Sequence, residues 1–445
     1  METNLTKGSP LKLILAFSLP VFLGNLFQIF YNLIDMAIVG RFVSVQALAA
    51  VGAVGSVMFC LTGIVTGLAN GFGICVARYY GAGEDDTMKR YAAVSVWLCL
   101  IVGLMITVIG LLGIDGLLQL MSTPPDIYAD ARTYLWIIIV GTLITLTYNM
   151  LSCLLRAVGD SKTPLYFLIF SSCLNILFDL LAVVLLHMGV AGVAWATVTA
   201  QLISAILCFW YIRKHFTILH MEKDQWRFSG KIAVSLLKMG VPMALQFSVC
   251  SIGTMIVQAA MNGLGSVAVA AYAVAGKLAS FVEQPFVSIG TAMATYVGQN
   301  YGAGEHKRIH RGVKVGLGLS AVCVIILFVL SFTIMRPAAE LFVGKGETEV
   351  IAMAEQYFRI IAWFYPCLGV IFVYRNALQG LGDGFVPMFA SVMELAARAG
   401  VVAIIGTRYG FSGVIMANPL AWVAAVLPLV PVFDLRMSKF KKVLQ

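Results

Sequence analysis

Long apolar runs set the pattern of this chain. The first run, 13–39, contains one ionised side chain, Asp35, within the segment YNLIDMAIVG. It is longer than the roughly 20 residues that a helix needs to cross a bilayer at about 1.5 Å per residue. Similar runs follow along the whole chain, and this pattern predicts twelve membrane-spanning helices. We place them near 13–39, 47–77, 92–113, 132–155, 164–186, 190–212, 233–261, 267–297, 313–335, 350–374, 385–406 and 412–435.

The composition agrees with a membrane protein. Of the 445 residues, 60% are hydrophobic and 11% are charged, whereas a soluble protein has about 25% charged residues. The nine cysteines are scattered without a CxxC motif, so we expect free thiols and neither a disulfide framework nor a metal site. The first apolar run has no signal-peptide cleavage site, and we interpret it as an uncleaved first span. These features predict an all-α, polytopic membrane protein.

The basic residues predict its orientation. When the loops between the predicted spans are assigned alternately to two sides, most of the 30 Lys and Arg residues fall on one side. The positive-inside rule then places both termini in the cytoplasm of a multi-pass protein of the plasma (cytoplasmic) membrane. The formal net charge of +9 is explained by this topology, so we expect no nucleic-acid partner.

The chain contains an internal repeat. The segment YYGAGEDDTMKR at 79–90 recurs as NYGAGEHKRIHR at 300–311, and RAVGDSKTP at 156–164 recurs as QGLGDGFVP at 379–387. The tripeptide SLP that ends at Pro20 likewise matches GVP, which ends at Pro242. The matches occur in the same order at nearly the same spacing, which predicts a duplicated architecture.

This repeat divides the chain into two six-helix bundles. We expect bundles at 1–212 and 232–445, joined by a basic cytoplasmic linker at 213–231. Because six is even, both bundles begin on the same side of the membrane, and the repeats are parallel, as in some secondary transporters. Duplication retained for packing alone is the alternative.

Residues that recur in both copies are expected to serve the architecture. They are Gly81, Gly83, Gly159, Asp160 and Pro164. We assign the glycines to tight turns, the aspartate to a turn or helix cap, and the proline to the start of the fifth span. Gly63, Gly67 and Gly71 lie four residues apart on the second span, which predicts close helix packing.

The charges inside the membrane do not recur, which makes them better functional candidates. Asn175 and Asp179 share one helical face of the fifth span. Together with Asp35 they can line a cavity that holds a cation, because Na⁺ prefers several oxygen ligands; a proton on one carboxylate is the alternative. Thr197 in the sixth span offers a further oxygen, although a threonine in a membrane helix commonly bonds its own backbone.

The second half offers different groups. Glu394 and Arg398 lie four residues apart on the eleventh span, which favours an ion pair. Glu283 has no charged partner on its own helix, so it faces either a cavity or an arginine of another helix, Arg375 or Arg398. The candidates for a substrate cavity are Glu283, Gln284, Gln246, Arg398 and Tyr31.

Taken in order, the motifs SLP, YNLIDMAIVG, YYGAGE, LRAVGDSKTP, NILFD, GVAGVAWAT, QNYGAGE and LQGLGD resemble those of the multidrug and toxic compound extrusion (MATE) transporters. The resemblance covers essentially the whole chain. It implies twelve helices in two bundles that form a V-shaped cavity. It also implies export of drugs or other organic cations against inflow of Na⁺ or H⁺.

The resemblance implies a cation site at Asp35, Asn175, Asp179 and Thr197, where this sequence has the expected residue types. Some members of the family carry further carboxylates on the seventh and tenth helices. Here Gln246 and Gln258 lie on the seventh helix and Arg375 lies towards the end of the tenth, so a second-half cation site is not implied.

We therefore expect a monomeric secondary antiporter that exports organic, cationic, drug-like compounds in exchange for Na⁺ or H⁺ by alternating access. Its partners would be a small-molecule substrate and membrane lipid, with no cofactor besides the coupling ion. The alternatives are a flippase for a lipid-linked or amphipathic substrate and a passive channel. An enzyme is not expected, because the sequence contains no evident pairing of a nucleophile with a base and no metal-ligand cluster.

Overall fold

The computed structural model describes residues 4–121, 123–344 and 346–443, and the regular elements within these ranges are helices. Twelve helices in the described ranges are long and apolar enough to cross a membrane, which confirms the predicted fold class. The chain forms two compact units. Unit 1 is Leu23–Ala244, and unit 2 combines Leu5–Phe22 with the chain from Leu245 onward.

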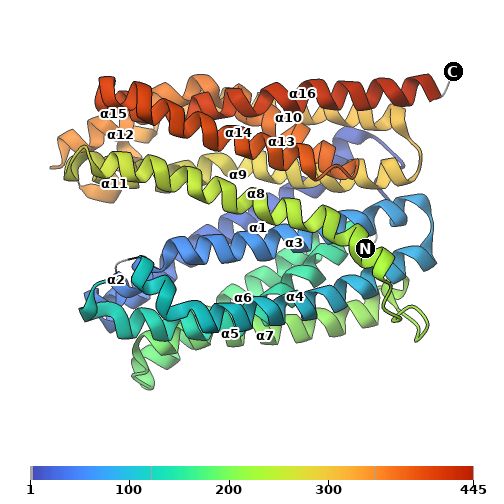
Figure 1. Cartoon of the computed structure of the whole chain (residues 1–445), viewed down its shortest axis with the longest axis horizontal. Helices are drawn as coiled ribbons and strands as arrows, with labels where there is room; N and C mark the ends of the chain where they lie inside the picture. The colour runs from blue at the N-terminus through green and yellow to red at the C-terminus, as the bar shows by residue number, and fades with distance from the viewer. Residues whose placement is uncertain (1–3, 122, 345, 444–445) are drawn as a thin grey trace. The chain divides into compact units, whose positions relative to one another are not determined.

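In unit 1 the long helices run side by side (Figure 1). Its elements are α1 (Pro10–Ile38, from Leu23 onward), η1 (Val39–Val43), α2 (Val45–Ala53), α3 (Gly55–Ala82), α4 (Asp85–Leu120), α5 (Pro125–Ala157), α6 (Lys162–Leu180), η2 (Leu181–Leu185), α7 (Gly189–His215), η3 (Thr217–Leu219) and the first part of α8 (Gly230–Asn262). The predicted span 47–77 is thus two helices, because the short α2 precedes α3 and both are apolar.

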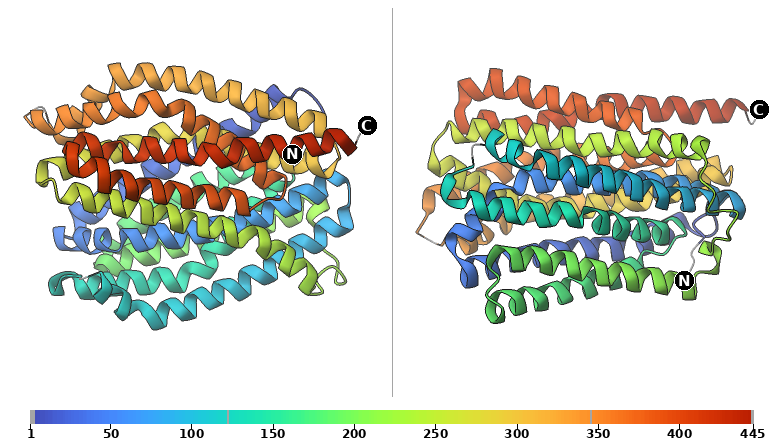
Figure 2. Two further views of the ribbon diagram at one scale, coloured as in Figure 1. Left: turned by 45° about the horizontal axis from the view of Figure 1, so that its top comes forward. Right: turned by 60° about the horizontal axis from the view of Figure 1, so that its bottom comes forward.

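The helices of unit 2 also run side by side, and Figure 2 shows both units from two further directions. Its elements are the first part of α1, the second part of α8, α9 (Ser266–Gly302), α10 (His306–Thr333), α11 (Met335–Val343), α12 (Thr348–Ile361), η4 (Ala362–Phe364), α13 (Tyr365–Gly380), α14 (Phe385–Val401), η5 (Val402–Gly406), α15 (Thr407–Ile415) and α16 (Ala417–Val443). The predicted span 350–374 corresponds to α12, η4 and α13, which together form one membrane-spanning segment.

Two helices are shared between the units. Helix α1 begins in unit 2 and continues into unit 1 after Phe22, whereas α8 begins in unit 1 and continues into unit 2 after Ala244. Both divisions fall shortly after a proline inside the helix, Pro20 in α1 and Pro242 in α8. An internal proline removes one backbone hydrogen bond, so it weakens the helix locally. The repeat-related prolines therefore lie where each shared helix passes from one unit to the other.

Each unit has its own apolar core. In unit 1, α5 packs against α3, α4 and α7, with Leu135 fully buried at its centre. In unit 2, α9 packs against α10, α12 and α13, with Phe286 and Phe358 fully buried. Large apolar side chains also cover the outside of the helices; Leu112 on α4, for example, is 85% exposed. Such exposed apolar surface is expected of helices in contact with lipid.

Several of the recurring residues have the structural roles predicted for them, whereas Gly81 lies inside α3 and not in a turn. Gly83 and its repeat partner Gly304 adopt positive φ angles of 73° and 71°, which favour glycine. Asp160 accepts hydrogen bonds from the backbone N–H groups of Lys162 (2.9 Å) and Thr163 (3.0 Å) at the start of α6. In the second half, Asp383 accepts from the N–H of Val386 (3.1 Å) at the start of α14. The repeated aspartates are thus helix caps.

The glycines of α3 allow a close helix crossing within unit 1. A Cβ atom on Gly67 would lie 2.7 Å from the Cα of Ala244, and one on Gly71 would lie 2.6 Å from the Cα of Gly240. Both contacts are with backbone atoms of α8, which no side-chain rotation can relieve. The predicted close packing is therefore confirmed for Gly67 and Gly71.

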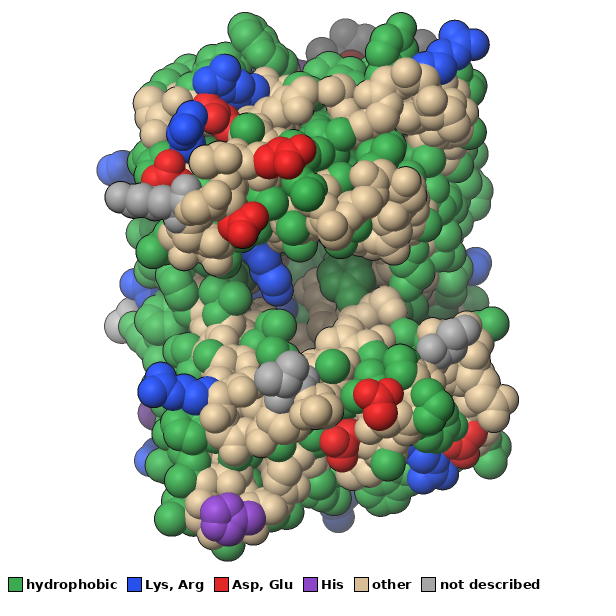
Figure 3. Space-filling model, turned by 90° about the vertical axis from the view of Figure 1, so that its left-hand side faces the viewer, with side chains coloured by type: hydrophobic (Ala, Val, Ile, Leu, Met, Phe, Trp, Pro, Cys, Tyr) green, Lys and Arg blue, Asp and Glu red, His purple; other side chains and the backbone are tan. Residues whose placement is uncertain are grey.

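The helices of each unit carry ion pairs. In unit 1, Asp115 near the end of α4 pairs with Arg132 of α5 at 2.7 Å. In unit 2, Glu355 pairs with Arg359 of the same helix, α12, at 2.7 Å. Figure 3 shows a face of the molecule on which acidic and basic side chains are interspersed among apolar ones. The pair of Asp115 and Arg132 is exposed on both sides and contributes little to stability.

Candidate functional site

The two acidic residues predicted in the first half of the chain come together in unit 1. The carboxyl groups of Asp35 on α1 and Asp179 on α6 lie within hydrogen-bonding reach of each other. Asp179 is fully buried and Asp35 is half-buried. One buried oxygen of each group, Oδ1, has no hydrogen-bond partner among the described residues. Two carboxylates this close repel each other unless a proton or a cation lies between them.

Asn175 links Asp179 to the sixth span. In the amide orientation that satisfies both of its ends, Nδ2 donates to Oδ2 of Asp179 at 3.1 Å. Oδ1 then accepts from the backbone N–H of Thr197 at 3.2 Å, and the Thr197 hydroxyl lies at the same distance. Asn175 is 2% exposed, so burial makes these bonds hard to replace with water. The amide thereby fixes the position of a carboxylate that carries an unpartnered oxygen.

Thr197 makes the backbone hydrogen bond considered for it, and its hydroxyl also lies beside Asn175. Its hydroxyl has the carbonyl oxygen of Val193 in the preceding turn of α7 as an acceptor at 3.2 Å. The same oxygen lies beside the amide of Asn175, and its side chain is half-buried. A hydroxyl that donates to its own backbone still has lone pairs available as an acceptor or ligand.

Tyr31, a candidate for the substrate cavity, lies beside this group. It lies in unit 1, one helical turn before Asp35, and its hydroxyl hydrogen-bonds Thr197. Tyr134 of α5, a residue that the sequence analysis did not single out, is a further neighbour of Tyr31. The four-residue spacing of Tyr31 and Asp35 could have indicated the grouping of Tyr31, because such residues share a helix face. No sequence signal pointed to Tyr134.

A π-helical turn follows the carboxylate on α6. Helix α6 ends at Leu180, and the π turn η2 begins at Leu181, two residues after Asp179. In the second half, η5 follows α14 at the corresponding position, although no carboxylate precedes it there. Because the turn occurs in both halves, we assign it to the repeated architecture, which in unit 1 also positions Asp179.

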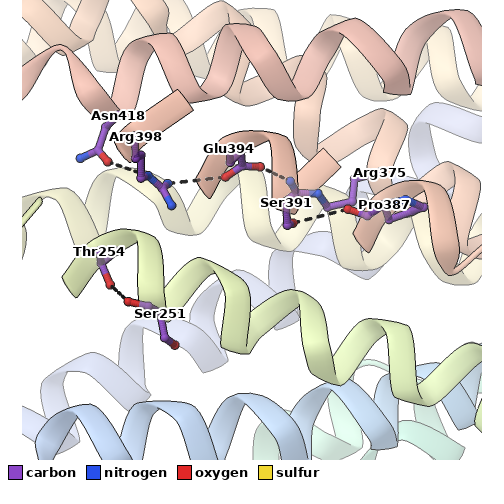
Figure 4. A network of polar contacts seen from close by, with 8 residues as sticks. All are labelled: Ser251, Thr254, Arg375, Pro387, Ser391, Glu394, Arg398 and Asn418. Carbon is purple, nitrogen blue, oxygen red and sulfur yellow. Dashed lines mark hydrogen bonds and ion pairs between the residues drawn. The ribbon is translucent and has the colours of Figure 1, made fainter. Parts of the chain in front are cut away.

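In unit 2, Glu394 lies between two arginines (Figure 4). Its Oε1 pairs with Nη2 of Arg375 on α13, and its Oε2 lies 3.5 Å from Nη2 of Arg398, one turn along α14. The predicted pair of Glu394 and Arg398 is thus present, but it is not self-contained, because Arg375 makes the shorter contact. All three side chains are buried. Nε of Arg398 donates to Oδ1 of Asn418 on α16 at 3.1 Å.

The other substrate-cavity candidates are in the same unit. Glu283 on α9 makes no hydrogen bond among the described residues, but it lies close enough to Arg398 for their charges to interact. Gln284 donates to the carbonyl of Ser280 on its own helix at 2.9 Å. Gln246 on α8 accepts from Gln379 of α13 at 3.1 Å. The structure therefore brings Glu283 and Arg398 near each other, whereas Gln284 and Gln246 are engaged in other contacts.

The residues in unit 1 fit a hard monovalent cation or a proton. Asp35, Asp179 and Thr197 offer oxygen atoms, which such ions prefer, and two of the carboxylate oxygens lack a partner. Within the described ranges, no group of three His, Cys, Asp or Glu side chains could hold a metal ion. Asp35, Asp179 and Thr197 thus place oxygen atoms with free acceptor capacity among the apolar helices of unit 1.

Comparisons with known proteins agree with the repeat. A family model described as MatE matches the chain twice, at residues 20–181 and 242–404. The chain is 31% identical over 385 residues to the probable multidrug resistance protein YpnP of Bacillus subtilis. This match covers 85% of the chain and 84% of the relative. It is 23% identical over 427 residues to the probable multidrug resistance protein NorM of Thermotoga maritima. This match covers 94% of the chain and 89% of the relative.

A solved structure shows the same fold. It is described as the outward-facing conformation of a multidrug resistance MATE family transporter of the MOP superfamily. The match has a TM-score of 0.92 at 22% identity and covers 98% of each chain. Both copies of the repeat match the family model, and the relatives share most of their length with this protein. The chain is therefore a multi-pass membrane protein that belongs to the MATE family of multidrug efflux transporters.

Proposed function

We propose that this protein is a secondary antiporter that exports organic, drug-like compounds in exchange for Na⁺ or H⁺ by alternating access. The coupling ion binds in unit 1 at Asp35 and Asp179, with Asn175 and Thr197 as the supporting groups. The observation that carries the proposal is the contact between the two carboxyl groups, each with a buried oxygen that lacks a partner. An ionised carboxylate inside a membrane is costly and normally has a functional partner.

The coupling follows from the positions of the two carboxylates on different helices. Asp35 is on α1, which is shared between the units, and Asp179 is on α6, which lies within unit 1. With both groups ionised and no ion present, their repulsion favours separation of α1 from α6. A bound cation removes the repulsion and favours the arrangement in which they are close. An ion can shift such an equilibrium only by its different affinity for the two arrangements.

The multidrug resistance and export names of the relatives support a drug-like substrate and do not favour a lipid-linked one. The test is dye efflux from a host that lacks its own drug pumps. Cells that produce Asp35→Asn at wild-type levels should accumulate dye like cells without the protein, because an amide cannot carry the negative charge that the ion neutralises. Wild-type efflux by this variant would remove Asp35 from the mechanism.

Transport with exchange also separates a carrier from a passive channel. In proteoliposomes loaded with unlabelled substrate, a carrier takes up labelled substrate transiently above equilibrium, because it exchanges one molecule for another. A channel only lets the label equilibrate. We expect counterflow for the wild-type protein, and simple equilibration would contradict alternating access.

A further inference from the structure

In the buried charge cluster of unit 2, the positively charged groups outnumber the carboxylates that pair with them. Two guanidinium groups, Arg375 and Arg398, share a single carboxylate, Glu394. We propose that this cluster is a carboxylate-binding subsite and that Arg398 determines specificity for compounds that carry a carboxylate. Binding at this subsite does not depend on the proposed export function. Only the statement that the bound compound is exported rests on that function.

Two N–H groups of the cluster lack an acceptor. Nε of Arg375 and Nη1 of Arg398 are buried and have no hydrogen-bond partner among the described residues. The two residues are 7% and 6% exposed, so water does not readily replace the missing acceptor. An unpaired donor on a buried charged group is costly. An anionic ligand would remove that cost by accepting these bonds.

The geometry favours a carboxylate over other acceptors. The planar guanidinium fork matches the two oxygens of a carboxylate, and Glu394 already contacts each arginine through one nitrogen, Nη2. Asn418 holds Nε of Arg398 at 3.1 Å and thereby fixes the plane of the group. Figure 4 shows Arg398 between Asn418 of α16 and the part of α8 that contains Ser251 and Thr254. The fork is therefore held in one orientation before a ligand arrives.

Helix α8 covers the unpartnered edge of Arg398 without a side chain. A Cβ atom on Gly253 would lie 2.6 Å from Nη1. The guanidinium thus rests directly on the backbone of α8, and a modest shift of this helix uncovers the N–H. Because α8 is one of the two helices shared between the units, such a shift is expected during transport.

Aromatic side chains adjoin the cluster. The rings of Tyr272 on α9 and Tyr357 on α12 are in edge-to-face contact, with centroids 6.0 Å apart. Both hydroxyls hydrogen-bond Asn418, the residue that orients Arg398. Aromatic surfaces bind flat apolar groups well. The subsite therefore suits a compound with an aromatic body and a carboxylate attached to it.

Glu283 competes with the ligand for Arg398. The negative charge of Glu283 acts on Arg398 without a hydrogen bond, so it lowers the affinity of Arg398 for a second negative group. The N–H groups of Arg398 stay available to a ligand. Replacing Glu283 with glutamine should therefore strengthen carboxylate binding relative to binding of an uncharged analogue.

A matched pair of fluorescent probes tests the inference. A rhodamine with a free carboxyl group and its methyl ester differ only in the group that Arg398 would bind. Binding of each to the purified full chain in detergent is measured by fluorescence anisotropy, and the readout is the ratio of the ester Kd to the acid Kd. We expect a ratio of roughly ten or more for the wild type, as for charge-assisted hydrogen bonds.

The variants separate charge from folding. Arg398→Gln should lower the ratio to about one, Arg398→Lys should retain part of it, and Glu283→Gln should raise it. Gly253→Ala keeps every charge but displaces the guanidinium, so it should also lower the ratio. The control is Arg359→Gln on α12, an exposed arginine paired with Glu355 at 2.7 Å, which should leave the ratio unchanged.

The results that would overturn the inference are a wild-type ratio of one or less, or an unchanged ratio in a folded Arg398→Gln variant. Displacement of the acid probe by chloride as readily as by benzoate would also overturn it, because the site would then take a small inorganic anion. Binding is measured without an ion gradient. If the protein distinguishes the probes but shows no ion-driven transport, the subsite proposal therefore stands and only the antiport proposal fails.

Discussion

Asp35 of α1 and Asp179 of α6 place their carboxyl groups within hydrogen-bonding reach of each other inside unit 1. The two residues are far apart in the sequence, and neither has an acidic counterpart in the second half of the repeat. The first half therefore carries a feature that duplication of the architecture does not explain. We assign this contact of two carboxyl groups to the binding of the coupling ion.

Replacing the buried member of this pair should abolish coupled export. In Asp179→Asn the remaining carboxylate can hydrogen-bond the amide, so the demand for a cation disappears, and we expect at least a tenfold loss of dye efflux from cells. Asp115→Asn is the control, because Asp115 is an exposed carboxylate paired with Arg132. Efflux should be unchanged in the control, and equal losses in both variants would point to a general effect on expression.

Removing the amide of Asn175 should change ion binding more than it slows transport. In Asn175→Ala, Asp179 loses a charge-assisted hydrogen bond at 3.1 Å, and such bonds contribute about 1.5–3 kcal/mol. For Na⁺, the concentration for half-maximal transport should rise about tenfold or more, because the carboxylate is no longer held in place. For H⁺ it should fall, because the lost bond favoured the ionised carboxylate. The maximal rate at saturating ion should change much less.

Thr197 provides a matched comparison for Asn175. Thr197→Ser keeps the hydroxyl and should retain wild-type ion dependence, whereas Thr197→Val removes it and should resemble Asn175→Ala. Transport by each variant is measured over a range of ion concentrations. An Asn175→Ala variant with the wild-type half-maximal concentration would exclude the amide from the ion site.

A methyl group on α3 should destabilise the protein. In Gly71→Ala the new Cβ would lie 2.6 Å from a backbone atom of α8, and overpacking of this kind typically costs about 1–3 kcal/mol. We expect a Tm lower by several degrees in detergent. Gly113→Ala on α4 is the control, because its Cβ would meet nothing within 4 Å, and a similar loss in both variants would contradict the crossing.

Loss of the helix cap at Asp160 should also lower stability. Asp160 is buried and accepts from two backbone N–H groups and from the Thr163 hydroxyl at 2.7 Å. Removing a cap costs about 1–2 kcal/mol, so Asp160→Ala should lower the Tm. Asp160→Asn keeps an acceptor and should lose less. If alanine and asparagine had equal effects, the capping role would be wrong.

The sequence predicted the spans well because an apolar run of sufficient length is itself the requirement for crossing a bilayer. It did not separate α2 from α3, because both are apolar and a single residue, Val54, lies between them. It also did not predict α11 between two spans. Short helices outside the spans depend on packing, and an apolar run in the sequence gives no information on that packing.

The candidate site was predictable where its residues share a helix and less so where they do not. Asn175 and Asp179 are four residues apart, and that spacing predicted their common face. The contact of Arg375 with Glu394 joins α13 to α14, and it was not predicted, because local spacing carries no information on partners from other helices. Tyr31, which we predicted as a substrate-cavity residue, lies one helical turn from Asp35, and this spacing indicates that the two share a helix face.

The most direct test of the account is transport by purified protein in proteoliposomes with a Na⁺ gradient or an H⁺ gradient imposed alone. One of the two gradients should drive substrate against its concentration gradient in the wild type, and neither should do so in Asp35→Asn/Asp179→Asn, although that variant should still bind substrate. Gradient-driven transport by the double variant would contradict the assignment of the coupling ion to these two carboxylates.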